Sequence, residues 1–195
     1  DIGGPTLVRA AAKNYKYTTV LTSPHQYKEF ILDLEKNRGS TSLELRKKLS
    51  QEAFNLTAYY DSVISGYLND KNNNHFPLKK TIHGNLVEVL RYGENPHQKS
   101  AIYSKNKNLD ISQLSGKKLS YNNLNDIYAA LSISRTLPKN NGTVIVKHAN
   151  PCGVSINKNN LESYKEALAC DPISAFGGIV SCNFKVDKKL AIELN

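Results

Sequence analysis

The stretch Gly142-Thr143-Val144-Ile145-Val146-Lys147-His148 decides the fold class. Its four consecutive β-branched residues, Thr143 to Val146, are typical of a strand that is buried on both faces. Apolar residues recur at helical spacing on either side of it, over residues 125–134 and 161–170. A buried strand between two amphipathic helices predicts an α/β fold.

Shorter segments extend this pattern toward both ends of the chain. The polar run of residues 69–80 has no hydrophobic period, so we take it as a linker and expect domains at 1–74 and 75–195. Further strands are expected at Tyr17–Leu21, Leu86–Leu90, Ala101–Tyr103 and Ile179–Cys182. Further helices are expected after Pro5, at Tyr27–Lys36 and, as one or two helices after the cap-like Ser40 and Thr41, over Thr41–Leu68.

Composition narrows the class of protein. With 39% hydrophobic and 22% charged residues, the 195-residue chain has enough apolar material for a packed core. The net charge of +9 comes from scattered lysines among many asparagines, which indicates compositional bias more than a nucleic-acid stripe. A noncatalytic RNA- or nucleotide-binding module is the alternative to an enzyme. We expect neither nucleic acid nor membrane as a partner. Three unpaired cysteines and the lack of a long apolar run predict a soluble cytoplasmic protein.

Lys147 and His148 form the strongest candidate site because they follow the buried strand directly. A Pro/Gly-containing loop, Asn150 to Gly153, is expected after them. Open α/β sheets bind ligands at the carboxyl ends of strands. A histidine transfers protons near neutral pH, and a lysine stabilises negative charge on oxygen. The alternative is an exposed lysine beside a structural histidine.

A zinc site is a further alternative at the same place. His148 followed by Pro151-Cys152 resembles the zinc deaminases, whose signature continues to a second cysteine three residues after the first. Here that position is Ser155, and Asn150 stands where the catalytic glutamate is expected. The sequence therefore predicts that no zinc is bound.

Three further segments combine groups suited to substrate binding. Arg91–Gln98 holds a cation, two ring side chains and a carboxylate, although a solvated loop has the same composition. Asp171–Gly178 ends in two glycines that permit close approach of a ligand, or simply a tight turn. Tyr121–Asp126 is rich in hydrogen-bonding side chains, for which ordinary helix capping is the favoured interpretation.

The opening Asp1–Asn14 is the weakest of these candidates. Glycines before a helix present backbone N–H groups to an anion, and Arg9 and Lys13, four residues apart, add charge on one face. An ordinary helix start with a solvated cationic face would have the same sequence.

Five segments taken in order, DIGGPTLVRAAAKN, RYGENPHQ, LSYNNLND, VKHANPCGV and DPISAFGGIV, resemble the bifunctional purine biosynthesis family of AICAR transformylase/IMP cyclohydrolase. Five ordered matches are more specific than any single one. The sequence opens at Asp1 without methionine and stops at Asn195 within an expected helix, so we expect an internal fragment of such an enzyme.

The resemblance implies two partial domains and a place in de novo purine synthesis. Residues 1–74 would be the tail of a methylglyoxal-synthase-like cyclohydrolase domain, and 75–195 the first part of a cytidine-deaminase-like αβα transformylase domain. The implied reactions are formyl transfer from 10-formyltetrahydrofolate to AICAR, giving FAICAR, and cyclisation of FAICAR to IMP with loss of water. The resemblance further implies a folate cosubstrate, a site without zinc, and a homodimer for the intact enzyme.

The resemblance also implies roles for individual residues in formyl transfer. Lys147 and His148 match the catalytic pair. Substrate binding would involve Arg91, Tyr92, Phe176 and Gly177. A later asparagine and the folate-binding elements of the family would follow Asn195.

For cyclisation, the resemblance implies catalytic roles for Asp1 and Lys13. Gly3 and Gly4 would form part of the ribotide site. The family's other catalytic lysine and tyrosine would precede Asp1.

Overall fold

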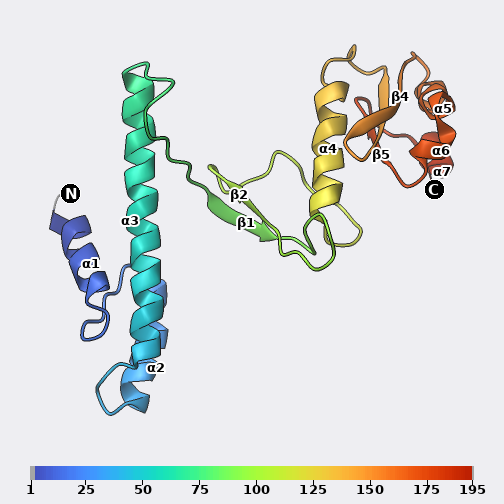
Figure 1. Cartoon of the computed structure of the whole chain (residues 1–195). Helices are drawn as coiled ribbons and strands as arrows, with labels where there is room; N and C mark the ends of the chain where they lie inside the picture. The colour runs from blue at the N-terminus through green and yellow to red at the C-terminus, as the bar shows by residue number, and fades with distance from the viewer. Residues whose placement is uncertain (1–2, 195) are drawn as a thin grey trace. The chain divides into compact units, whose positions relative to one another are not determined.

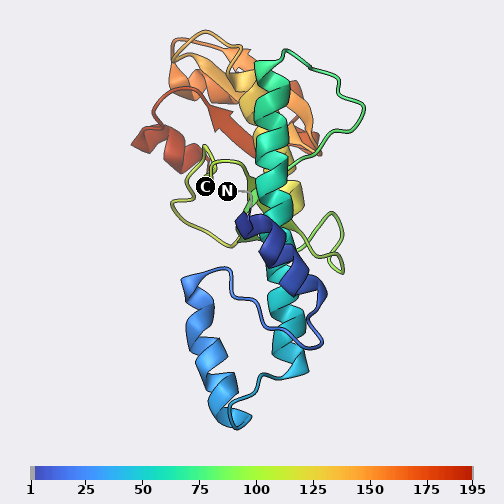
Figure 2. The ribbon, with the colours of Figure 1, turned by 90° about the vertical axis from the view of Figure 1, so that its left-hand side faces the viewer.

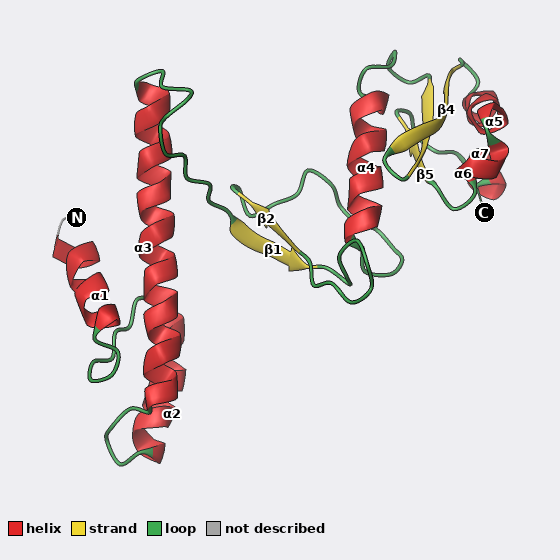
Figure 3. Ribbon diagram, in the orientation of Figure 1, coloured by secondary structure: helices red, strands yellow, loops and turns green. Residues whose placement is uncertain are grey.

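The computed structural model describes residues 3–194, which form a mixed α/β chain. Two compact units are present, Asp1–Asn85 and Leu86–Asn195, and we call them the helical unit and the sheet unit (Figures 1 and 3). The helical unit contains α1 (Gly3–Lys13), the 3-10 helix η1 (Pro24–Gln26), α2 (Tyr27–Lys36) and α3 (Leu43–Lys71). The sheet unit contains β1 (Asn85–Val89), whose first residue is the last of the helical unit, together with β2 (Ala101–Ser104), α4 (Tyr121–Ser134), β3 (Gly142–Lys147), β4 (Asn150–Ile156), α5 (Asn160–Cys170), α6 (Pro172–Ala175), β5 (Ile179–Cys182) and α7 (Lys188–Glu193).

In the helical unit, α1 packs along α3 (Figures 1 and 2). Leu45, Leu49 and Ala53 are buried on α3 at intervals of four residues, which places them on one face of the helix. Ala12 of α1 is fully buried, and its carbonyl accepts a hydrogen bond of 2.7 Å from the Ser50 hydroxyl. The small side chain of Ala12 therefore allows the two helices to approach closely.

The strand expected at Tyr17–Leu21 does not form, so that prediction is wrong. A β-rich segment becomes a strand only when another strand supplies its hydrogen bonds, and none pairs with it among the described residues. The preceding chain is instead held by Arg46 of α3, whose guanidinium donates to the carbonyls of Tyr15 at 2.9 Å and Lys16 at 3.0 Å.

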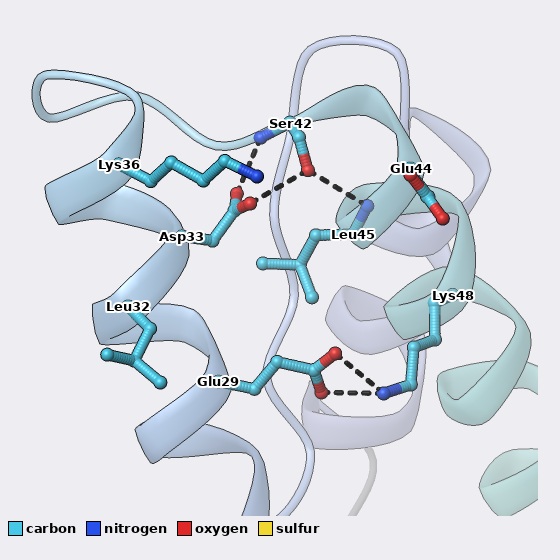
Figure 4. Close-up of a pocket in the computed structure, with 8 residues that line it drawn as sticks. All are labelled: Glu29, Leu32, Asp33, Lys36, Ser42, Glu44, Leu45 and Lys48. Carbon is cyan, nitrogen blue, oxygen red and sulfur yellow. Dashed lines mark hydrogen bonds and ion pairs between the residues drawn. The ribbon is translucent and has the colours of Figure 1, made fainter.

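Helix α2 is joined to α3 by polar contacts (Figure 4). The predicted helix at Tyr27–Lys36 is confirmed, and residues 43–71 form one helix whose cap is Ser42 rather than Ser40 or Thr41. The Asp33 carboxylate accepts from the backbone N–H of Ser42 at 2.7 Å and from its hydroxyl at 3.0 Å. These hydrogen bonds, the backbone one above all, lower the pKa of Asp33.

The sheet unit is built around β3. Strands β1 and β2 pair with each other, and a separate sheet has the order β4-β3-β5, with β3 antiparallel to both neighbours. Side chains alternate across β3: Val144 and Val146 pack with Ala130 of α4, whereas Ile145 packs with Tyr164 of α5. The predicted strand is thus confirmed, and it lies between helices on both faces of the sheet (Figure 3).

Three local expectations in this unit need correction. The expected loop from Asn150 to Gly153 belongs to strand β4, which Pro151 does not prevent because β4 is an edge strand with a bulge beside Pro151. Helix α4 begins at Tyr121, because Ser120 and Asn123 form a capping box there. The segment Asp171–Gly178 contains the short helix α6.

Candidate functional site

Lys147 and His148 lie where β3 turns back into β4. Lys147 pairs with Asn150, so His148 and Ala149 are the two residues of the hairpin loop. Both have positive φ, at 54° and 59°. Two-residue hairpins with positive φ at both positions normally use Asn-Gly or Gly-Gly. A residue with a Cβ costs about 1 to 2 kcal/mol in this conformation, so the rest of the site must hold the turn.

The structure brings Lys147 together with the Phe176–Gly177 segment. The Lys147 ammonium donates a hydrogen bond to the Phe176 carbonyl and lies 5.9 Å from the centroid of its ring. Gly177 has φ of 69°, and a Cβ added there would lie 3.8 Å from Lys147 Nζ. Glycine therefore lets the chain turn close to the ammonium, and residues 29 positions apart in sequence share one site.

A surface cavity of about 500 Å³ opens beside this turn. It is lined by Lys147, His148, Asn150, Pro151, Cys152, Asp171 and Ser174. Hydrogen bonds from Ser174 lower the pKa of Asp171. The cavity therefore contains a carboxylate, an ammonium and an imidazole, which suits a polar substrate with exchangeable protons.

Helix α4 links this turn to the Arg91–Gln98 segment. At its start, Tyr121 N–H donates to the Tyr92 carbonyl at 3.2 Å, and Asn122 Nδ2 donates to the Glu94 carbonyl at 3.0 Å. One and a half turns later, the Asp126 carboxylate accepts from the backbone N–H of Ala149 at 2.7 Å. The two contact points are five residues apart, about 7.5 Å along the helix axis.

Arg91 and Tyr92 contact each other. The Arg91 guanidinium lies 4.8 Å from the centroid of the Tyr92 ring and donates to its hydroxyl at 3.2 Å. Arg91 is exposed, so its guanidinium remains accessible to an anion while the ring restricts its orientation. Gly93 is buried, and a Cβ there would lie only 2.8 Å from Gln98 Cβ, so this glycine allows the loop to close.

The candidate residues of the helical unit are spread along α1. Asp1 lies outside the described residues. Gly3 and Gly4 begin the helix, at the end whose dipole favours an anion, and Lys13 is exposed in its last turn. Ten residue steps separate Gly3 from Lys13, which is about 15 Å along a helix. The structure therefore does not bring the glycines and Lys13 together.

Arg9, on the same face of α1 as Lys13, lies 5.3 Å from the centroid of the Phe54 ring on α3. Its position is explained by packing between the two helices.

Within the described range, no group of three or more His, Cys, Asp or Glu side chains is placed to hold a metal ion. The expectation of a zinc-free site stays a prediction. None of the helices in residues 3–194 is long and apolar enough to span a membrane.

Sequence reasoning missed two acidic residues in the sheet unit. The sequence indicates Asp171 only as part of a turn, and Asp126 only as part of a capping segment. The signal for Asp126 was its spacing: it stands four residues before Ala130, on the helix face that packs against β3.

Comparison with known proteins identifies the family. The family model for the AICARFT/IMPCHase bienzyme matches residues 11–195. Similar relatives are the bifunctional purine biosynthesis proteins PurH of Brucella anthropi, at 44% identity, Mesorhizobium japonicum, at 45%, and Rhizobium rhizogenes, at 44%. Each alignment covers 100% of this chain and 37% of the relative, so the chain spans well under half the length of these proteins. The chain belongs to the AICARFT/IMPCHase bienzyme family.

Proposed function

We propose that the sheet unit carries the formyl-transfer centre of a de novo purine biosynthesis enzyme. The reaction moves the formyl group of 10-formyltetrahydrofolate to the 5-amino group of AICAR and yields FAICAR. The observation that carries the proposal is that Lys147 and His148 share a site with the Phe176–Gly177 segment, next to an open polar cavity. These are the residues to which the family resemblance assigns catalysis and substrate contact.

The chemistry requires a base and a group that stabilises negative charge. The 5-amino nitrogen of AICAR attacks the formyl carbon, a C–N bond forms, and the carbonyl oxygen becomes an oxyanion. The bond to N10 of the folate then breaks, and N10 gains a proton. The amine is a weak nucleophile because its lone pair is delocalised into the imidazole ring, so removal of its proton assists the attack.

His148 and Lys147 suit these two roles. His148 is exposed at the turn and removes or relays the amine proton. Lys147 stabilises the oxyanion or protonates the leaving folate nitrogen. Its hydrogen bond to the Phe176 carbonyl restricts where the ammonium lies, which reduces the reorganisation that the reaction requires.

Arg91 and Tyr92 suit the nucleotide part of the substrate. A guanidinium binds phosphate through two parallel N–H groups, and the contact with Tyr92 limits its motion. Hydrogen bonds from Tyr121 and Asn122 join this loop to α4, which also contacts the Lys147–His148 turn. Helix α4 thus supports phosphate binding and catalysis together.

The same proposal extends to the fold of each domain and to the oligomeric state, compartment and partners of the intact enzyme. Residues 75–195 are the first part of a cytidine-deaminase-like αβα transformylase domain, which the helices on both faces of the β4-β3-β5 sheet support. Residues 1–74 are the tail of a methylglyoxal-synthase-like cyclohydrolase domain. The intact enzyme is a cytoplasmic homodimer that binds folate without zinc and has no nucleic-acid or membrane partner.

The second proposed activity is cyclisation of FAICAR to IMP. The carboxamide nitrogen attacks the formyl carbon within the same molecule, and water is lost. In the helical unit, the start of α1 at Gly3 and Gly4 is suited to the ribotide phosphate. Lys13, at the other end of the helix, would then act on a different part of the substrate, together with Asp1.

The test of formyl transfer is a His148→Ala substitution in the full-length protein, assayed with 10-formyltetrahydrofolate and AICAR. Loss of the general base is expected to lower turnover by about 100-fold or more. Calorimetry is expected to find AICAR binding retained. The matched control is His25→Ala, because His25 is an exposed histidine of the helical unit that forms a hydrogen bond with the nearby Ser23, and its loss is expected to leave transfer unchanged.

The proposal is wrong if the wild-type protein transfers no formyl group. Equal activity of His148→Ala and wild type would leave the reaction in place but remove His148 from its centre.

A further inference from the structure

The residue types in the hairpin turn that presents Lys147 and His148 do not by themselves favour its conformation. Both loop residues, His148 and Ala149, are in the left-handed region although each carries a Cβ. Within the hairpin, the Asn150 side-chain amide donates to the His148 carbonyl at 2.9 Å. That contact fixes one peptide and leaves the Ala149 N–H to be satisfied from outside the hairpin.

Asp126 supplies the outside contact. Its Oδ1 accepts from the Ala149 N–H at 2.7 Å, over a separation of 23 residues. Asp126 is half-buried, so this hydrogen bond is partly shielded from water. A carboxylate is also a stronger acceptor for a backbone N–H than a neutral carbonyl.

The helix that carries Asp126 is itself fixed. Ser120 and Asn123 cap its first turn, and Ala130 is fully buried against Val144 and Val146 of β3. Asp126 stands one turn before Ala130, so the face that packs on the strand also directs the carboxylate to the end of that strand. The contact therefore joins the middle of α4 to the turn that follows β3.

We infer that Asp126 is a positioning residue for the Lys147–His148 centre. Its carboxylate holds the hairpin turn in the left-handed conformation from which His148 meets the substrate amine. Its effect on turnover rests on the proposed function, whereas its effect on the turn does not. The same helix contacts the Arg91–Gln98 segment through Tyr121 and Asn122, so α4 connects that segment to the Lys147–His148 turn.

Two substitutions in the full-length protein separate this role from a general effect on folding. Asp126→Ala removes the acceptor, and turnover of AICAR is expected to fall about 10- to 100-fold with little change in KM, because a small misplacement of a catalytic group has an effect of this size. Asp126→Asn keeps an oxygen for the Ala149 N–H and is expected to stay within about fivefold of wild type, because a neutral acceptor weakens the bond without abolishing it.

Hydrogen exchange of the peptide covering residues 147–151 gives a readout independent of activity. The turn is expected to exchange faster in Asp126→Ala and near the wild-type rate in Asp126→Asn. The matched control is Asp187→Ala, since Asp187 likewise accepts a backbone N–H, that of Leu190 at 2.9 Å, but caps α7. Turnover and exchange at 147–151 are expected to be unchanged in this variant.

If Asp126→Ala does not fold, the double substitution Asp126→Ala with Ala149→Gly serves instead, because glycine adopts positive φ without support. Recovery of both folding and turnover in the double variant would support the inference, because the glycine then holds the turn without Asp126. Recovery of folding without turnover, full turnover in a folded Asp126→Ala variant, or unchanged exchange at 147–151 in that variant would overturn it. A wild-type protein without formyl transfer would refute the proposed function, while the exchange measurement would still decide whether Asp126 holds the turn.

Discussion

Helix α2 of the helical unit has no buried residue, whereas strand β3 of the sheet unit is buried at five of its six positions. The first is held by polar contacts such as that of Asp33 with Ser42, and leaves Ile31 and Leu32 more than half exposed. The second is held by apolar side chains that pack against helices on both faces. Burial of a large aliphatic side chain contributes about 1.5 to 3 kcal/mol, more than an exposed polar contact does.

The two candidate sites differ in how firmly the surrounding packing holds their residues. In the sheet unit, the Lys147–His148 turn follows a strand buried at five of its six positions and is contacted by α4. In the helical unit, Gly3 and Lys13 lie at opposite ends of a helix whose contacts with α3 include Ala12 and Arg9. A rigid scaffold supports a defined catalytic geometry, and a loosely packed one does not.

The largest expected difference between the units comes from one substitution made in each. An added Cβ at Gly153 of β4 would overlap with the Ala167 carbonyl of α5, so Gly153→Ala is expected to destabilise the sheet unit by about 3 kcal/mol. Gly66 of α3 has no neighbouring atom within 4 Å of such a Cβ, so Gly66→Ala is expected to stabilise its helix by about 0.5 to 1 kcal/mol. Native-state hydrogen exchange of peptides from each unit measures both effects. Similar values for the two variants would mean that β4 and α5 are not tightly packed.

A second pair of substitutions compares buried with exposed isoleucine. Ile145 of β3 is 1% exposed and packs against α5. Ile145→Ala therefore leaves a cavity and is expected to lower the free energy of unfolding of the sheet unit by about 3 kcal/mol. Ile31 of α2 is 51% exposed, so Ile31→Ala is expected to change the helical unit by less than about 0.5 kcal/mol. The same exchange measurement distinguishes them. A large cost at Ile31 would show that α2 is covered in the intact protein.

The smallest expected effects concern one carboxylate in each unit. The pKa of Asp33 is lowered mainly by the Ser42 backbone N–H, and that of Glu166 mainly by the Ser155 hydroxyl at 2.5 Å. A lowered folded-state pKa gives stability that is present above the ordinary carboxyl pKa and is lost as pH falls through the folded value, below about pH 4. Acid is therefore expected to loosen both contacts.

The helical unit is expected to depend more on its carboxylate. Asp33→Asn is expected to speed exchange of the peptide covering residues 27–42 at pH 7 and to remove part of its acid sensitivity. Glu166→Gln is expected to leave β4 and α5 largely protected, because their apolar contacts remain. Equal responses in the two units would contradict the contrast drawn between polar and apolar packing.

Local sequence determined much of this protein. The β-branched run Thr143–Val146 indicated β3, and helical periodicity located α2 to the residue, because alternation and period report directly which face of an element is apolar. The segments containing Lys147–His148 and Phe176–Gly177 were also evident, since polar groups gathered beside apolar runs stand out. These two are among the five segments on which the family resemblance rests.

Tertiary structure alone decided how those segments combine. Tyr17–Leu21 has strand-forming residues but no strand to pair with, whereas β4 forms despite Pro151 and Gly153 because β3 lies beside it. Helical spacing places Asp126 on the same face of α4 as Ala130, but it does not identify Ala149, 23 residues away, as the partner of Asp126. Hydrogen-bond partners far apart along the chain are selected by packing, so the support of the Lys147–His148 turn is visible only once α4 lies against β3.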